Sequence, residues 1–415
     1  MIDQIVEQTT LKAITETLTR IFFGNFFSML LFVVSAGQWA VLWWLLWPEA
    51  PTPLLVHALG VTVVYLVNRQ ITGGYGRRTA RTVWRRFYDA YAFTSLFCAV
   101  FLLLTFVARE ITQLLVGTVL ATVQSDGAAA FGTDSVDVVF SWLRHGGVGL
   151  IALTLVYGYT IGQSRLKVTR LRLRLRNFDR LPGFCIAQIS DIHIGQNLTV
   201  EQLTHFVSSV NEVEPDLICI TGDIADNASS DLARFLPILG QLRARHAVVA
   251  ILGNHDHYAG ANRLADALRQ HTDFIVLRDA HVTLDIDGKP LHVVGLDDRG
   301  IDWARGVREL PYLADTLNAL PAGEPAVVLS HRPDIFPQAA ECGAALMLSG
   351  HTHGGQIAMP WRPGKALNPA RIATRFDRGL FREKDSFLYV NCGLGVTGQR
   401  VRLGTPREIS VIEAA

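Results

Sequence analysis

The sequence predicts two structural regions: an N-terminal bundle of membrane-spanning helices over residues 1–163 and an α/β domain over residues 164–415. Apolar residues make up 49% of the chain, which is high for a wholly soluble protein. This excess is concentrated in the first 163 residues. After residue 181, short β-branched runs alternate with helical stretches, a pattern typical of an α/β domain.

The N-terminal region contains several apolar runs of membrane-spanning character. Phe22 to Trp47 hold no charged side chain and exceed the roughly 20 residues that cross a hydrocarbon core. Residues 53–68, 91–108 and 146–163 are shorter or weaker apolar runs. We therefore predict about four transmembrane helices. Ile111–Val123 stays open between a further helix and an interfacial segment, because it is apolar but shorter than a span.

Basic residues around these runs predict the orientation of the bundle. The link between the first two runs has no basic residue, whereas the loop between the second and third carries six arginines: Arg69, Arg77, Arg78, Arg81, Arg85 and Arg86. By the positive-inside rule the arginine-rich loop is cytoplasmic. With four spans, the N-terminus and the α/β domain are also cytoplasmic, and the basic run from Arg165 to Arg176 agrees.

The C-terminal region reads as one α/β domain. We predict strands at Cys185–Ser190, Leu217–Thr221, Val248–Leu252, Leu291–Leu296, Ala326–Ser330 and Phe387–Asn391, and helices at Val200–Val213, Asp231–Arg243, Ala261–Gln270 and Pro333–Ala340. Their continuous apolar character indicates sheets that are covered on both faces. Residues 168–176 instead alternate apolar and basic side chains, so this strand has a basic face that either contacts anionic lipid headgroups or is solvated.

Five short polar segments each follow an apolar, strand-like run. They are Asp191-Ile-His193, Gly222-Asp223-Ile-Ala-Asp226, Gly253-Asn254-His255-Asp256, Ser330-His331 and Gly350-His351-Thr-His353-Gly354. One such segment alone usually lies on a solvated loop, but loops after the strands of an open α/β sheet are where functional residues gather. Carboxylates, imidazoles and a carboxamide in this order predict a pair of neighbouring divalent metals. Gly253 and Gly350 would let the ligands that follow approach an ion closely.

These five segments resemble the motifs of the calcineurin-like metallophosphoesterase superfamily, over roughly residues 183–414. Within it, Gly350-His-Thr-His-Gly-Gly-Gln356 and Tyr389-Val-Asn-Cys-Gly393-Leu-Gly395 resemble a membrane-associated bacterial branch of YkuE-like and YaeI-like phosphodiesterases. The resemblance implies a four-layer α/β/β/α domain. It also implies two divalent metal ions as cofactors, and the mixed oxygen and nitrogen ligands suit Mn, Fe or Zn.

The resemblance further implies a role for each residue. Asp191, His193 and His353 would bind one metal, Asn254, His331 and His351 the other, and Asp223 would bridge both. The ions would activate a water for in-line attack on phosphorus. His255 would stand beside the leaving oxygen as acid or charge stabiliser, and the Asp226 carboxylate would orient it through its other ring nitrogen.

Three positions qualify the resemblance. Ser/Thr protein phosphatases of this class carry an arginine where this chain has Asn227, which argues against protein phosphatase activity. Arg332 is a candidate for holding substrate phosphate, with a surface ion pair as the alternative. The Gly393-Leu-Gly395 turn either brings backbone amides near the substrate or is a plain turn.

We therefore expect a multi-pass enzyme of a bacterial-type inner (plasma) membrane that hydrolyses a phosphodiester or pyrophosphate bond. Its expected partners are membrane lipids and a lipid-linked substrate resembling UDP-2,3-diacylglucosamine. A net charge of +1 gives no reason to expect nucleic acid, and five widely spaced cysteines indicate no disulfide framework. The alternatives are a phosphodiesterase acting on soluble nucleotides, cyclic ones included, and a non-catalytic membrane scaffold or phosphate-ligand sensor.

Overall fold

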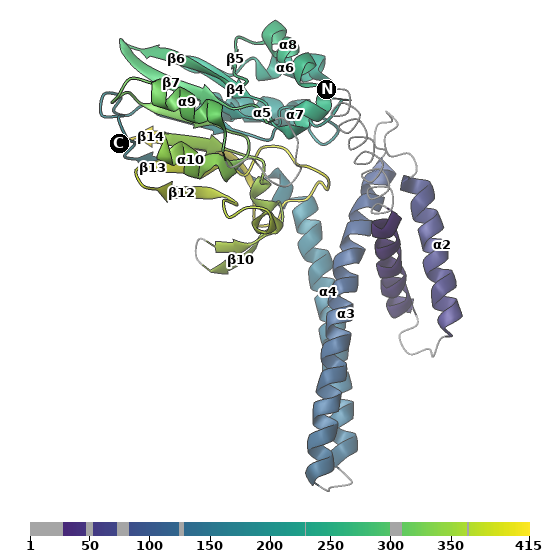
Figure 1. Ribbon diagram of the computed structural model, residues 1–415. Helices are drawn as coiled ribbons and strands as arrows, with labels where there is room; N and C mark the ends of the chain where they lie inside the picture. The colour runs from purple at the N-terminus through teal and green to yellow at the C-terminus, as the bar shows by residue number, and fades with distance from the viewer. Residues whose placement is uncertain are drawn as a thin grey trace, which may run out of the picture. The chain divides into compact units, whose positions relative to one another are not determined.

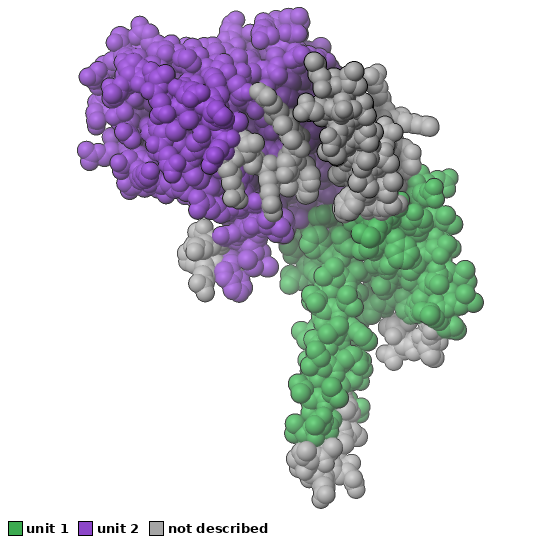
Figure 2. Space-filling model, viewed as in Figure 1, with its two compact units in different colours: residues 1–155 green, residues 156–415 purple. Residues whose placement is uncertain are grey.

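The computed structural model describes residues 28–46, 53–72, 83–123, 128–228, 230–298, 309–362 and 365–415. The chain divides into two compact units, Met1–Leu155 and Val156–Ala415 (Figure 2). The division falls inside the last N-terminal helix, because the final turn of that helix packs with the second unit. The membrane-region boundary predicted at residue 163 therefore lies a few residues beyond the point where the contacts separate.

The described part of the first unit consists of apolar helices. The first covers Ser28–Leu46, and it is followed by α2 (Leu54–Thr72), α3 (Val83–Val123) and α4 (Ala128–Tyr159) (Figure 1). Ser28–Leu46, Arg86–Val119 and Asp134–Ser164 are each long and apolar enough to cross a membrane, whereas Leu54–Gln70 is a shorter apolar helix. Of the arginines used to predict orientation, Arg77, Arg78 and Arg81 lie outside the described residues.

The segment Ile111–Val123, which the sequence left open, is the continuation of α3. Helix α3 runs to Val123 and α4 begins at Ala128, so most of the stretch between the predicted runs 91–108 and 146–163 is helical. The Nε of Arg109 lies 2.6 Å from Oδ1 of Asp137 on α4, and Gln113 donates to the same oxygen at 2.8 Å. The charges that interrupt the apolar pattern therefore compensate each other between the two helices. At 1.5 Å per residue, α3 is about 60 Å long, twice a hydrocarbon core of about 30 Å.

Two six-stranded sheets form the second unit. The first has the order β1 (Leu166–Leu173), β14 (Arg407–Ala414), β2 (Cys185–Ile189), β3 (Leu217–Thr221), β4 (Ala247–Ile251) and β5 (Ile275–Val276). The second has the order β12 (Gly379–Glu383), β13 (Ser386–Val390), β9 (Leu346–Ser349), β8 (Ala326–Leu329), β7 (Lys289–Gly295) and β6 (Ala280–Ile286). Strands β2, β3 and β4 are parallel to one another, as are β7, β8 and β9.

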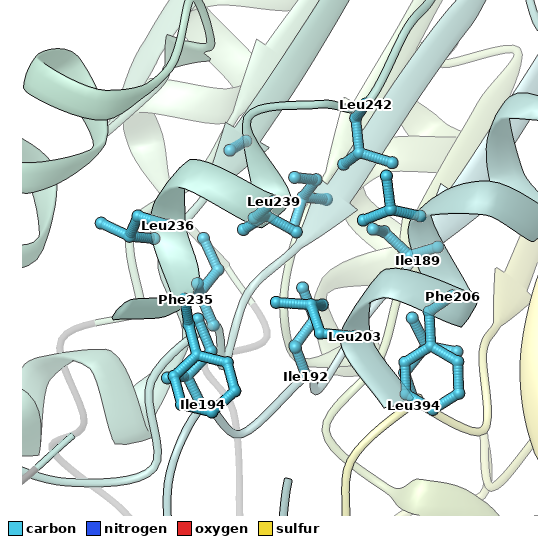
Figure 3. Packing of buried hydrophobic residues seen from close by; sticks show 14 of the residues in the cluster. Ile189, Ile192, Ile194, Leu203, Phe206, Phe235, Leu236, Leu239, Leu242 and Leu394 are labelled. Carbon is cyan, nitrogen blue, oxygen red and sulfur yellow. The ribbon is translucent and has the colours of Figure 1, made fainter. Parts of the chain in front are cut away.

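The two sheets pack face to face, and helices cover their outer faces. Ile186, Cys219 and Val249 of the first sheet share one buried cluster with Leu291, Val327 and Leu346 of the second. Helices α5 (Val200–Asn211), α6 (Leu232–Leu239) and α8 (Ala261–His271) pack on the first sheet, and α9 (Pro311–Ala319) and α10 (Phe336–Glu341) on the second. Figure 3 shows Leu203 and Phe206 of α5 beside Ile189 and Ile192. The predicted four-layer α/β/β/α domain is confirmed.

Local sequence explains why the helix that covers β2 begins where it does. Thr199 accepts a hydrogen bond from the Gln202 N–H, and the Gln202 side chain accepts one from the Thr199 N–H. This capping box satisfies amides that a helix start otherwise leaves without partners. Leu203, Phe206 and Val210 then recur on one face of α5 and are buried.

Smaller elements complete the second unit. They are the helix α7 (Asn254–Ala259), the 3-10 turns η1 (Gly162–Ser164), η2 (Pro333–Ile335), η3 (His353–Gly355) and η4 (Pro369–Ile372), and a hairpin of β10 (Met359–Arg362) with β11 (Lys365–Leu367). The hairpin forms a two-stranded sheet of its own, outside the two large sheets (Figure 1).

Candidate metal centre

The five polar segments meet at the carboxyl ends of strands in both sheets. Asp191 follows β2, Asp223 follows β3, Asn254 follows β4, His331 follows β8 and His351 follows β9. Because these strands are parallel within each sheet, their ends lie at one edge. The packing of the two sheets therefore brings all the predicted ligands together.

Most of these side chains are presented by an unusual backbone. Five of the seven predicted ligands have positive φ angles: Asp191 50°, His193 49°, Asp223 51°, His351 69° and His353 50°. Such left-handed conformations are uncommon for residues other than glycine and cluster at functional sites. β2 ends at Ile189, so Asp191 and His193 lie in the loop after the strand, and Ile192 between them is fully buried.

The first group of ligands comprises Asp191, His193 and His353, whose nearest ligand atoms all lie within 4.8 Å of one another. The Nε2 atoms of the two histidines face each other at 3.1 Å. The Nε2 of His353 lies 3.4 Å from Oδ1 of Asp191. Ring nitrogens and a carboxylate oxygen that converge in this way suit a divalent cation.

The second group comprises Asp223, His331 and His351, again with ligand atoms within 4.8 Å of one another. Oδ2 of Asp223 lies 3.2 Å from Nε2 of His331 and 3.6 Å from Nε2 of His193, so this oxygen stands between the two groups. Oδ1 of Asp223 accepts the His255 N–H at 2.8 Å, which fixes the carboxylate. Asp223 is thus placed to bridge two ions.

Buried polar atoms without hydrogen-bond partners indicate that these residues fit metal ions. Oδ1 of Asn254 and Nε2 of His331 are both buried without such a partner among the described residues. Nδ1 of His331 lies 2.8 Å from the Thr221 carbonyl, so it can donate there and leave Nε2 with a lone pair for an ion. Because unpaired buried polar atoms are costly, this arrangement favours bound cations.

The electrostatics of the centre also favour bound cations. Burial alone would lower the pKa of His331, but the adjacent Asp223 carboxylate outweighs it and raises the pKa to about 10. Burial lowers the pKa of His351 to about 3, and the positive charges of His331 and Arg332 add to this effect. Without ions, a proton on His331 therefore balances the carboxylate, and a dication can take the place of that proton.

Comparisons with known proteins agree with this geometry. A profile described as calcineurin-like phosphoesterase matches residues 185–355. The metallophosphoesterase YkuE of Bacillus subtilis is 33% identical over 232 residues, which are 55% of this chain and 78% of that protein. This chain belongs to the calcineurin-like metallophosphoesterase family. It is accordingly a metal-dependent phosphoesterase.

Alignments with two other relatives cover smaller shares of their lengths. The metallophosphoesterase Cj0846 of Campylobacter jejuni is 32% identical, and the chain spans 58% of its length. A transmembrane protein with metallophosphoesterase domain from Danio rerio is 28% identical over 270 residues, which are 63% of this chain and 60% of that protein. The solved structure of TT1561 from Thermus thermophilus covers 51% of this chain and 90% of its own at 15% identity, with a TM-score of 0.34. The apolar helices and the transmembrane relatives together make this metallophosphoesterase a membrane-associated protein.

The predicted partnership between His255 and Asp226 takes a different form from the one expected. Nδ1 of His255 lies 2.9 Å from the backbone carbonyl of Asp226 and 3.7 Å from its carboxylate. The carboxylate lies closer to Nδ1 of His193, at 3.4 Å, and it accepts from the Asn227 side chain at 2.7 Å. The metallophosphoesterase thus orients His255 mainly through a carbonyl, which still leaves Nε2 of that ring for substrate.

Asp256, which is not among the predicted ligands or catalytic residues, organises the loops of the centre. Its buried carboxylate accepts the N–H groups of Ile224 at 3.2 Å, Ala225 at 2.7 Å and Gly253 at 2.9 Å. These bonds join the loop of Asp223 to the loop of Asn254. The only sequence signal was its position two residues after a predicted ligand.

Glycine at position 253 is required by close packing at the bridging ligand. A Cβ atom there would collide with Oδ1 and the backbone nitrogen of Asp223. At position 350, a Cβ atom would collide with Ser190 and with Oδ2 of Asp191. Both glycines are therefore needed for close packing against the ligand carboxylates, and the predicted close approach of the following ligands to an ion stays a prediction.

Arg332 is buried beside the second ligand group. Its Nε lies 2.6 Å from Oδ2 of Asp298, so the alternative of an ion pair holds, although the pair is not on the surface. Its two terminal nitrogens, Nη1 and Nη2, are buried without hydrogen-bond partners among the described residues. A guanidinium anchored on one side with two donors to spare suits a phosphate oxygen.

Proposed function

We propose that this membrane-associated metallophosphoesterase hydrolyses a phosphodiester or pyrophosphate bond in a lipid-linked substrate, of the kind represented by UDP-2,3-diacylglucosamine. The observation that carries the proposal is the short connection between membrane helix and catalytic domain. Helix α4 ends at Tyr159 and β1 begins at Leu166, with only the 3-10 turn η1 between them. A domain tethered so closely meets membrane-borne substrates at a high effective concentration.

The side chains of the centre divide the chemistry. Asp191, His193 and His353 would hold one ion, Asn254, His331 and His351 the other, and Asp223 both. Bound divalent ions would supply an activated water and would neutralise negative charge on the phosphate oxygens. The ring of His255, held through Nδ1, presents Nε2 for proton donation to the leaving oxygen. Nη1 and Nη2 of Arg332 are the candidates for orienting a phosphate oxygen.

The proposal includes a location. We place the protein in a bacterial-type inner membrane with the catalytic domain on the cytoplasmic side. Support comes from the arginine-rich stretch between α2 and α3 and from the basic residues that follow α4. Membrane lipids are then the immediate partners of the protein, and the substrate lies in the cytoplasmic leaflet.

A substrate panel tests the proposal. Full-length protein in lipid nanodiscs with Mn²⁺ is given two substrates that share one phosphodiester linkage, one carrying two acyl chains and one with none. We expect a preference of at least about tenfold in kcat/KM for the acylated substrate, which is about 1.4 kcal/mol of transition-state discrimination. Equal values would refute the lipid assignment and favour soluble nucleotides. The Asp223→Asn variant provides the background rate.

A further inference from the structure

The hairpin β10–β11 and the turn η4 carry exposed apolar side chains. We name residues 359–362 and 365–372 the docking hairpin. Met359 is 63% exposed, Trp361 64%, Leu367 49% and Ile372 88%. Single exposed apolar residues are ordinary on soluble proteins, but four large ones within one short projecting segment mark an interaction surface. The second unit buries its other large apolar residues mainly in three clusters.

The charge of the same segment is one-sided. Residues 359–372 contain three basic residues, Arg362, Lys365 and Arg371, and no acidic residue. Tryptophan with neighbouring arginine and lysine is the composition found at membrane interfaces, where the ring lies at headgroup level and the cations face anionic lipid. The chemistry of the segment therefore matches a lipid surface better than an acidic protein surface, which would leave Met359 and Ile372 without apolar contacts.

The base of the docking hairpin is held by a loop that also holds the end of α4. The Ala358 N–H donates to the Leu403 carbonyl at 2.8 Å, and the Leu403 N–H donates to the Gln356 carbonyl at 2.8 Å. The adjacent Arg402 N–H donates to the Gly158 carbonyl in the last turn of α4 at 3.2 Å. Two consecutive residues thus join the hairpin to the helix within the second unit.

That attachment is rigid. The Arg402 side chain is fully buried and donates to the carbonyls of Cys392 at 2.9 Å and Gly393 at 3.0 Å. The buried Arg407 donates from Nε to the Gln163 carbonyl in η1 at 2.6 Å. Arg407 thus holds η1, which directly follows α4, and the Arg402 side chain holds the loop whose backbone contacts Gly158.

The helix end also locates the membrane boundary. The apolar span that begins at Asp134 in α4 runs to Ser164, and a run of basic residues follows from Arg165. Ile161 in this stretch is 56% exposed. The hydrocarbon core therefore ends near the same residues that contact Val401 and Arg402.

We propose that the docking hairpin inserts its apolar side chains into the headgroup region of the bilayer that α4 enters, with the exposed Arg371 on anionic lipid phosphates. The occupant of this surface is thus the membrane itself. Attachment to the end of α4, through the consecutive residues Arg402 and Leu403, is the argument for that choice over a second protein.

Docking at this point would also set the depth of the metal centre. Asn368 of the hairpin donates to the Asp377 carboxylate at 2.6 Å, and Thr352, between His351 and His353, donates to the Asp377 carbonyl at 2.6 Å. Gln356 donates to the Thr397 carbonyl at 2.9 Å on the opposite loop. The ligands are therefore tied to a segment at headgroup level, which suits a phosphate at that level. This last step rests on the proposed function, whereas docking itself does not.

A site-directed fluorescence experiment tests docking. Full-length chain carrying Cys185→Ser and Cys342→Ser, which removes the two partly exposed thiols, receives Trp361→Cys and a thiol-reactive dye. The matched control is Leu380→Cys on β12, where an apolar residue of the same unit is 41% exposed. Vesicles contain phosphatidylcholine with phosphatidylglycerol, and either nitroxide lipids or aqueous iodide serve as the quencher.

We expect lipid nitroxides to quench the dye at position 361 at least threefold more than at position 380, and iodide to show the reverse order. Adding Arg371→Glu should reduce the lipid quenching on anionic vesicles by about half. Equal quenching at the two positions by either reagent would overturn the proposal. A dye at 361 shielded from both quenchers, with disulfide cross-linking of two W361C chains, would overturn it in favour of a second copy.

Turnover separates this inference from the proposed function. In the otherwise native chain, Trp361→Ser should lower the ratio of turnover on a vesicle-borne phosphodiester to turnover on bis(p-nitrophenyl) phosphate about tenfold. Lipid quenching at 361 without any hydrolysis of lipid-linked phosphodiesters would support docking and refute the proposed substrate class. Hydrolysis of such lipids without lipid quenching at position 361 would refute docking and support the proposed substrate class.

Discussion

The two units of this chain distribute the same apolar residue types in opposite ways. In the first, Leu104 and Leu153 are 64% and 70% exposed, while in the second Ile186 and Ile218 are fully buried. Polar groups are reversed too: in the first unit, the buried Asn68 donates to Ser35 at 2.7 Å and to Gln38 at 2.8 Å. A bundle that is apolar outside and polar inside suits lipid as its solvent. The second unit has the reverse order, and several of its buried polar groups lie at the metal centre.

The largest effect is expected where the second unit concentrates buried charge. Asp223→Asn keeps the shape of the side chain but removes the charge that stands between the two ligand groups. We expect turnover to fall roughly 1000-fold, which is about 4 kcal/mol of lost transition-state stabilisation, together with loss of bound metal. Turnover and metal content are measured on the same preparation. Wild-type turnover in the variant would refute the bridging role, and Asp231→Asn at the exposed start of α6 serves as the control.

A smaller effect, on stability, should distinguish buried apolar residues of the second unit from exposed apolar residues of the first. Ile218→Ala in β3 removes buried contacts and should lower the free energy of unfolding by about 3 kcal/mol. Leu153→Ala on α4 should change it by no more than about 0.5 kcal/mol, because that side chain faces the surrounding solvent. Thermal or denaturant unfolding in detergent measures both. Equal losses would mean that Leu153 packs against protein.

The next largest effect is expected when the loop connection made by Asp256 is lost. In Asp256→Asn the side chain keeps one acceptor oxygen where three backbone N–H groups need partners. We expect a loss of about 2 kcal/mol in stability and a drop in metal affinity of roughly 10- to 100-fold. Unfolding with and without Mn²⁺ and a metal titration measure the two effects. An unchanged metal affinity would show that the loops of Asp223 and Asn254 do not depend on this carboxylate.

The smallest effect is expected in the first unit. Asn68→Leu removes the hydrogen bonds to Ser35 and Gln38 and should destabilise the bundle by about 1 kcal/mol, as interhelical hydrogen bonds in membranes usually do. Unfolding in detergent, followed by helical circular dichroism, measures it. Catalytic turnover of the second unit in the same sample is the control. A gain in stability would mean that the polar interior is retained for something other than packing.

Much of the fold could be predicted because its signals are local. β3 was predicted with its observed bounds, and β2, β4, β7, β8 and β13 within two residues. β14 was missed because Glu408 and Ser410 interrupt its apolar pattern. Both are buried, and Glu408 accepts from Tyr389 at 2.7 Å and Thr169 at 2.6 Å. Because these partners lie far from Glu408 in the sequence, no local sequence pattern predicts that this carboxylate is buried.

The candidate site shows the same limit. Each predicted ligand could be found because it follows an apolar run, and the structure brings all seven together; their metal-binding roles remain predictions. The left-handed backbone at His351 and His353, the carbonyl that holds His255 and the three amides gathered by Asp256 depend on neighbours from other segments. In the first unit, likewise, α3 passes through Arg109 because Asp137 lies opposite on another helix.

The left-handed ligand residues have a consequence for the life of the protein. Five costly backbone conformations surround two buried carboxylates, so the folded domain should be least stable before it acquires its ions. Ion binding should then raise the unfolding temperature and not merely enable hydrolysis. A cell short of the divalent ions would then lose more of the polypeptide to proteases, because the ion-free domain unfolds more readily.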